Sequence, residues 1–86
     1  MRVLIPTPLR SYTQQRAHVQ AEGATLDAVL HDLDRQFPGI RFRMINEQGR
    51  MRPHIRFFVH DSPVHDLALP LAPEDEVMIV QALSGG

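Results

Sequence analysis

The clearest pattern of hydrophobic and polar positions lies between residues 25 and 37. Apolar side chains recur there at i, i+3, i+4, i+7 and i+11, namely at Leu26, Val29, Leu30, Leu33 and Phe37. This spacing predicts an amphipathic α-helix that buries one face. Thr25 is the predicted N-cap, and Asp27 is favourably placed in the first turn. Pro38 followed by Gly39 predicts the end of the helix.

Short β-branched and aliphatic runs precede this helix. Residues 1–5 predict a strand that ends at Pro6, because proline cannot donate to a sheet ladder. Residues 17–21 predict a second strand that Glu22 and Gly23 terminate, and the polar stretch 11–16 predicts the turn between the two. After the helix, residues 40–52 are rich in arginine and contain the turn formers Asn46 and Gly49. They predict a connection with little regular structure.

The second half of the chain predicts three more strands. Residues 55–60 have high β propensity, residues 61–63 predict a turn, and residues 64–66 predict a short partner strand. An apolar stretch broken by prolines, 67–73, leads to a turn at Glu74 and Asp75. Residues 76–82 then alternate as the last strand, with its odd- and even-numbered side chains on opposite faces.

This element order predicts an α+β fold in which a mixed sheet of four to five strands packs on one main helix. We expect Val3, Ile5, Val77 and Ile79 on the sheet face that meets the helix. If the first and last strands are parallel neighbours, the architecture is the ubiquitin-like β-grasp, whereas an α/β plait would need a second helix. The predicted division is a domain over residues 1–82 and a flexible C-terminal diglycine tail over residues 83–86.

Composition supports a single small globular domain. The 86 residues are 43% hydrophobic and 22% charged, which is ordinary for globular proteins. There is no cysteine, so disulfides, thiol nucleophiles and side-chain persulfides are excluded. No apolar run approaches the roughly 20 residues that cross a bilayer, and residues 1–9 are too short for a signal peptide. We therefore expect a cytoplasmic protein.

Charge is unevenly distributed although the net charge is only −1. All nine basic residues are arginines, and five of them, with one glutamate, give residues 41–56 a net charge of +4. Such a segment predicts either an anionic partner or a solvated rim. The chain as a whole lacks the basic excess of a nucleic-acid-binding protein.

The last four residues, Leu83, Ser84, Gly85 and Gly86, carry the strongest candidate chemistry. They allow two interpretations: chain-end residues without a role, or a tail that enters a narrow active site of another protein. Glycine suits the second, because a backbone without Cβ atoms can closely approach a catalytic centre.

Motifs along the whole chain give this tail a context. They are Ile5-Pro6-Thr7 with Leu9-Arg10, Thr25-Leu26 at the helix start, Phe57-Phe58-Val59 before a turn, Asp75-Glu76-Val77 with Ile79, and the final Gly85-Gly86. Together they resemble the MoaD/ThiS family of ubiquitin-like sulfur carriers. The opening motif is most similar to the subgroup that serves biosynthesis of cysteine and related sulfur metabolites.

The resemblance implies a carrier that is itself no enzyme and binds no cofactor. A ubiquitin-activating-like adenylyltransferase would use ATP to adenylate the Gly86 carboxylate, and a sulfurtransferase or sulfide would convert it to a thiocarboxylate. A biosynthetic enzyme would accept the sulfur. Some relatives also need a metalloprotease to remove extra terminal residues. Residues 83–86 would enter the partner's active site, and the docking face would contain Leu4, Met78 and Val80.

Three other functions stay open from the sequence. The chain also fits a small subunit of molybdopterin synthase, although residues 81–84 stand where such subunits carry prolines. It fits a ubiquitin-like protein modifier as well. A nucleic-acid-binding β-grasp module would use the arginines of residues 41–56 with Phe42, Phe57 and Phe58. A metal site is not predicted, because His54, His60 and His65 lack a metal-ligand spacing.

Overall fold

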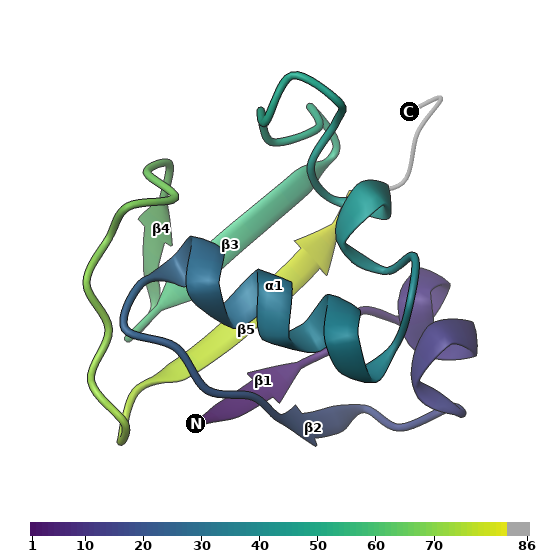
Figure 1. Cartoon of the computed structure of the whole chain (residues 1–86), viewed down its shortest axis with the longest axis horizontal. Helices are drawn as coiled ribbons and strands as arrows, with labels where there is room; N and C mark the ends of the chain where they lie inside the picture. The colour runs from purple at the N-terminus through teal and green to yellow at the C-terminus, as the bar shows by residue number, and fades with distance from the viewer. Residues whose placement is uncertain (83–86) are drawn as a thin grey trace.

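The computed structural model describes residues 1–82. The elements in chain order are β1 (Arg2–Leu4), 3-10 helix η1 (Thr7–Thr13), β2 (His18–Gln20), α1 (Leu26–Gln36), 3-10 helix η2 (Arg41–Arg43), β3 (Ile55–Val59), β4 (Ser62–Val64) and β5 (Glu76–Gln81). One five-stranded sheet forms a layer that α1 crosses on one face (Figure 1). Within residues 1–82, no helix has the length and apolar character needed to cross a membrane.

The sheet has the strand order β2-β1-β5-β3-β4, with the last strand of the chain at its centre. β5 runs parallel to β1 and antiparallel to β3, while β2 and β4 complete antiparallel pairs at the two edges. The first and last strands are thus parallel neighbours, so the predicted ubiquitin-like β-grasp is confirmed.

Helix α1 forms where the periodicity predicts it. The Thr25 hydroxyl oxygen accepts a hydrogen bond from the Ala28 backbone N–H at 3.2 Å, which satisfies one of the first N–H groups of the helix. The helix ends at Gln36, and Gly39 adopts a φ of +97°, a backbone conformation that glycine tolerates well. The predicted apolar stripe is buried along its whole length.

The core lies between α1 and the sheet. Val3, Ile5, Val77 and Ile79 are buried on the inner sheet face, as the alternation predicts. The connection between α1 and β3 also contributes, because Ile40, Met44 and Ile45 are completely buried. This connection therefore contains more structure than the sequence pattern predicts: η2 and a β-bridge between Ile45 and Met51.

The β3–β4 hairpin differs from its prediction. The partner strand begins at Ser62 and ends at Val64, so the predicted strand over residues 64–66 is wrong. His60 and Asp61 form the turn with φ values of +52° and +64°, which shortens the loop. Pro63 pairs opposite Phe58. β4 tolerates this proline because it is an edge strand, where a residue without an N–H group can face away from the neighbouring strand.

The connection between β1 and β2 also differs. The sequence pattern predicts only a turn over residues 11–16, but residues 7–13 form η1, and the turn after it contains Gln14 and Gln15 at positive φ. Proline at the start of η1 fits because the first N–H groups of a helix need no partner within it. This short helix covers the end of the sheet at which β1 and β5 both finish (Figure 1).

Candidate functional site

The C-terminal end of β5 is the fixed base from which the predicted functional tail continues. β5 ends at Gln81, and the Ala82 backbone N–H donates a hydrogen bond to the His54 carbonyl oxygen at 2.8 Å. The tail, with Gly85 and Gly86, lies outside the described residues. The candidate site therefore consists of the surfaces that surround the C-terminal end of β5.

An apolar groove runs along the sheet face opposite α1. It has a volume of about 480 Å³, and the half-buried side chains of Leu4, Met78 and Val80 line it. Leu4 and Met78 are direct partners in the parallel ladder. The structure thus brings together the three residues of the predicted docking face, because β1 and β5 are neighbours.

The groove also contains residues that the sequence pattern does not assign to it. They come from the segment after β1 and include Pro6, Pro8 and Arg10. The Arg10 Nε donates to the Ile5 carbonyl oxygen at 3.0 Å, which fixes this cationic side chain beside the apolar surface. The one signal in the sequence is the Pro6-Thr7-Pro8 run, which predicts the end of a strand but not the short helix η1 after it.

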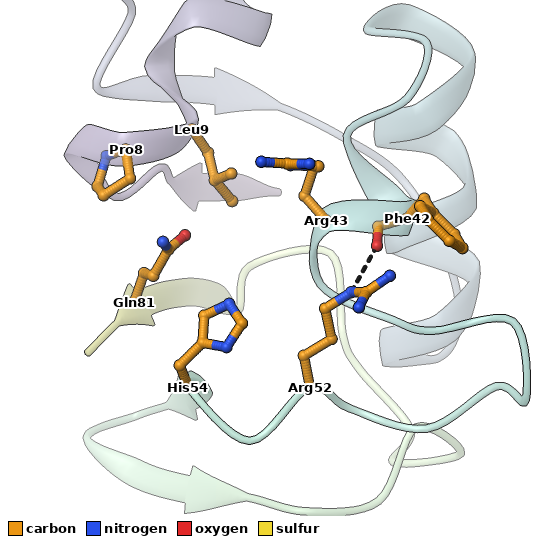
Figure 2. Close-up of a pocket in the computed structure, with 7 residues that line it drawn as sticks. All are labelled: Pro8, Leu9, Phe42, Arg43, Arg52, His54 and Gln81. Atoms are coloured by element: carbon orange, nitrogen blue, oxygen red, sulfur yellow. Dashed lines mark hydrogen bonds between the residues drawn. The ribbon is translucent and has the colours of Figure 1, made fainter. Parts of the chain in front are cut away.

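A second hollow adjoins the groove at the end of β5. This cationic pocket has a volume of about 380 Å³ and is lined by Pro8, Leu9, Phe42, Arg43, Arg52, His54 and Gln81 (Figure 2). Pro8 and Gln81 line both hollows. The lining of the cationic pocket within residues 1–82 contains two arginines and a histidine but no acidic side chain, so its electrostatic potential favours an anion.

Phe42 and Arg52 contact each other at the rim of the cationic pocket. The Arg52 Nε donates to the Phe42 carbonyl oxygen at 2.7 Å, and its guanidinium carbon lies 4.6 Å from the centroid of the Phe42 ring (Figure 2). Hydrogen bonding and the cation–π interaction therefore act on the same two residues. The backbone N–H of Arg52 also donates to the Met44 carbonyl oxygen at 2.9 Å, which ties the pair to the buried core.

The structure divides the arginine-rich segment into different roles. Arg41 pairs with Asp27 of α1 at 2.8 Å, and Arg56 donates to the backbone carbonyls of Pro53 and Ile55. Arg43 is exposed at the cationic pocket, whereas Arg50 is exposed outside it. The segment is thus neither a uniform solvated rim nor a continuous basic stripe.

His60 and Asp75 form a separate hydrogen-bonded pair at the other end of the sheet. His60 Nε2 lies 2.5 Å from Asp75 Oδ1, and Asp75 Oδ2 accepts a hydrogen bond from the Ala72 N–H at 2.7 Å. Hydrogen bonds from Ala72 and then His60 lower the pKa of Asp75 from its ordinary value of 3.8. Within residues 1–82, no three potential metal-ligating side chains gather at one place.

Comparison with known proteins covers almost the entire chain. The model of the ThiS family matches residues 3–86. The sulfur carrier protein CysO of Mycobacterium tuberculosis is 36% identical over an alignment 89 positions long, which covers 98% of this chain and 96% of that protein. A crystal structure of CysO from that organism matches with a TM-score of 0.89 at 34% identity, covering 95% of this chain and 98% of the other. A chain in the crystal structure of the Amycolatopsis orientalis BexX/CysO complex matches with a TM-score of 0.90 at 31% identity, covering 99% and 98%.

Proposed function

This chain belongs to the ThiS family, and we propose that it is a sulfur carrier that holds its cargo as a thiocarboxylate on Gly86. The observation that carries the proposal is the match over nearly the full length to sulfur carrier proteins, combined with the Gly85-Gly86 pair, which the family match includes. The sulfur would enter the biosynthesis of cysteine or another sulfur-containing metabolite.

The chemistry requires activation of the carboxyl group before sulfur can be attached. A carboxylate is a poor electrophile because its charge is delocalised and oxide is a poor leaving group. In the proposed first step, a carboxylate oxygen of Gly86 attacks the α-phosphorus of ATP and pyrophosphate leaves. In the second, sulfide or the terminal sulfur of a persulfide attacks the acyl carbon and AMP leaves. With a persulfide, a second thiol then reduces the remaining disulfide and releases the thiocarboxylate, a strong nucleophile.

The composition of the chain is compatible with a role as the protein substrate of an activating enzyme. The chain has no cysteine, so the terminal carboxyl group would hold the sulfur. It has no lysine either, so an activated Gly86 meets no lysine amine on its own molecule. We propose that a ubiquitin-activating-like adenylyltransferase supplies the catalytic groups and binds ATP, while this chain acts as its protein substrate.

The fold supports presentation of a terminal segment to such an enzyme. β5 is hydrogen-bonded on both sides, to β1 and to β3, so the strand that leads to the tail is held at the centre of the sheet. The apolar groove beside it offers partly buried Leu4, Met78 and Val80 as a docking face. One structural relative is crystallised as a BexX/CysO complex, which supports the proposal that this chain also works through partner proteins.

Intact-mass spectrometry tests the proposal directly. The chain is incubated with its candidate activating enzyme, ATP and sulfide, and replacement of one oxygen by sulfur should add about 16 Da. A variant without Gly86 should show no gain in mass but unfold at the same temperature, because the buried core is built by residues 1–82. A reaction without ATP is the control. A mass gain in the variant that lacks Gly86 would contradict the assignment of the site.

A further inference from the structure

We propose that the cationic pocket and the Phe42 ring form a docking site for a partner protein. The matching surface of that partner would carry carboxylates around an apolar depression. This inference rests on the proposed function and deepens it, because it assigns a contact chemistry to the enzyme that receives the tail. The Phe42 ring would occupy the apolar depression of the partner, while Arg43 and Arg52 would face the partner's carboxylates.

Charge is the first argument for this partner. Arg2, Arg35 and Arg41 each pair with a carboxylate of the same chain. Among residues 1–82, no carboxylate forms an ion pair with Arg43 or Arg52. Their positive charges are therefore uncompensated by that part of the chain, and an acidic partner surface would complement them.

The exposed aromatic ring is the second argument. Phe42 is 53% exposed, whereas the other large hydrophobic side chains within residues 1–82 are buried or half-buried. It belongs to η2, which lies directly between the fully buried Ile40 and Met44. The ring is thus displayed from an anchored element and held by Arg52. Aromatic and arginine side chains that are ordered before binding are typical of interface hot spots, because less conformational entropy is lost on association.

The position of the cationic pocket is the third argument, because it indicates that the partner is the protein that binds the tail. Gln81 lines both the cationic pocket and the apolar groove, and the proposed tail begins two residues later. The hydrogen bond between Ala82 and the His54 carbonyl fixes the chain at this point. A protein that binds residues 83–86 is brought next to both hollows, so the cationic pocket adds a charged contact beside the apolar docking face.

The same features fit a nucleic acid less well. Single-stranded nucleic acids are bound by successive aromatic platforms on which bases stack. Phe57 is buried in the core, and Phe58 lines a different hollow together with His60. Among the described residues that line the cationic pocket, Phe42 is the one phenylalanine, which favours a protein surface over an RNA strand.

Steady-state kinetics with the activating enzyme tests the inference. The rate of thiocarboxylate formation is measured against the concentration of the carrier, for the wild type and for Phe42→Ala, Arg43→Glu and Arg50→Glu. We expect the first two variants to raise KM about tenfold each with kcat nearly unchanged, the signature of a lost docking contact. Arg50→Glu makes the same charge change in the same segment outside the cationic pocket, and its KM should match the wild type.

Three further measurements separate the possible outcomes: thermal unfolding, the salt dependence of KM, and binding of an oligouridylate. Thermal unfolding of each variant checks that the fold is intact, and the KM of the wild type should rise with salt because exposed charges are screened.

If the wild type is converted but Phe42→Ala and Arg43→Glu keep its KM, the docking site is wrong and the proposed function stands. If the wild type gains no sulfur with its cognate enzyme, both proposals fail. Salt-sensitive binding of an oligouridylate that Arg43→Glu abolishes, with KM unchanged, would overturn docking in favour of RNA.

Discussion

Val3 on β1 lies directly opposite Val77 on β5 in a parallel register, and neither side chain is exposed. This pair joins the beginning of the chain to the strand from which the tail continues. β2 adds to one side of the pair and β3 to the other, each antiparallel. β5 is thereby anchored in the core near its start, and its pairing with β3 extends to Gln81, so the strand that leads to the tail is held along its length.

Truncation of this central pair should destabilise the fold without changing the docking surface. We expect Val77→Ala to lower the free energy of unfolding by about 2 kcal/mol, since two buried methyl groups are lost and a small cavity remains. Urea denaturation measures the loss. The folded variant should keep the wild-type KM for the activating enzyme, because the Val77 side chain belongs to the buried core. A changed KM with wild-type stability would contradict this assignment.

The neighbouring position on the opposite sheet face should behave in the reverse manner. Met78 is partly buried in the apolar groove, so Met78→Ala should cost less stability than Val77→Ala. It should raise the KM for thiocarboxylate formation about five- to tenfold, as loss of an apolar interface contact does. Chemical denaturation and steady-state kinetics on the same two preparations compare the two faces. Equal effects of the two variants on KM would show that the groove has no docking role.

The N-cap of α1 gives a local test of helix stability. Thr25→Ala removes the hydroxyl that accepts from the Ala28 N–H, and we expect a loss of about 1 kcal/mol. Thr25→Ser keeps an acceptor at this position and serves as the matched control, with stability near that of the wild type. Thermal or urea unfolding followed by circular dichroism measures both. Equal stability of Thr25→Ala and the wild type would exclude a capping contribution.

Gly23 should be intolerant of a side chain for a reason that only the fold reveals. A Cβ atom there would lie 2.6 Å from the Val29 backbone nitrogen and 2.8 Å from the Ala28 carbonyl carbon. Backbone atoms of α1 cannot move aside without disturbing the helix, so Gly23→Ala should cost about 1–3 kcal/mol. Gly49→Ala is the comparison, because its Cβ would meet no atom within 4 Å and only the backbone φ of +76° opposes it. Urea denaturation should rank Gly23→Ala as the less stable variant.

Asp75 should contribute an acid-sensitive part of the stability. The pKa of this carboxyl group is lowered in the folded state by hydrogen bonds from the Ala72 N–H and from His60. Its contribution is therefore fully present well above the ordinary pKa of 3.8 and is lost as the pH falls below that value through the folded-state pKa. Asp75→Asn should be less stable than the wild type at pH 6, and the difference should shrink toward pH 2. Glu74→Gln, an exposed neighbour, is the control.

The docking face is the part of the candidate site that the sequence predicts, because the side chains of a strand alternate between its two faces. The alternation of the last strand separates Val77 and Ile79 from Met78 and Val80, and the structure places these two pairs on opposite faces. The cationic pocket has no such local pattern. Its lining comes from four parts of the chain that lie apart in the sequence: residues 8–9, residues 42–43, residues 52 and 54, and residue 81. Their contact depends on strand order and on η2.

The sequence by itself determined the helix, most strand positions and the order of elements that specifies a β-grasp. These features depend on side chains a few residues apart, whose burial on one face is visible as a period in the chain. Tertiary structure alone decided the burial of Ile40, Met44 and Ile45, the two-residue turn at His60 and Asp61, and the display of Phe42 beside Arg52. Each of these depends on contacts or backbone angles without a periodic signature, because the free energy that selects them comes from packing between distant segments.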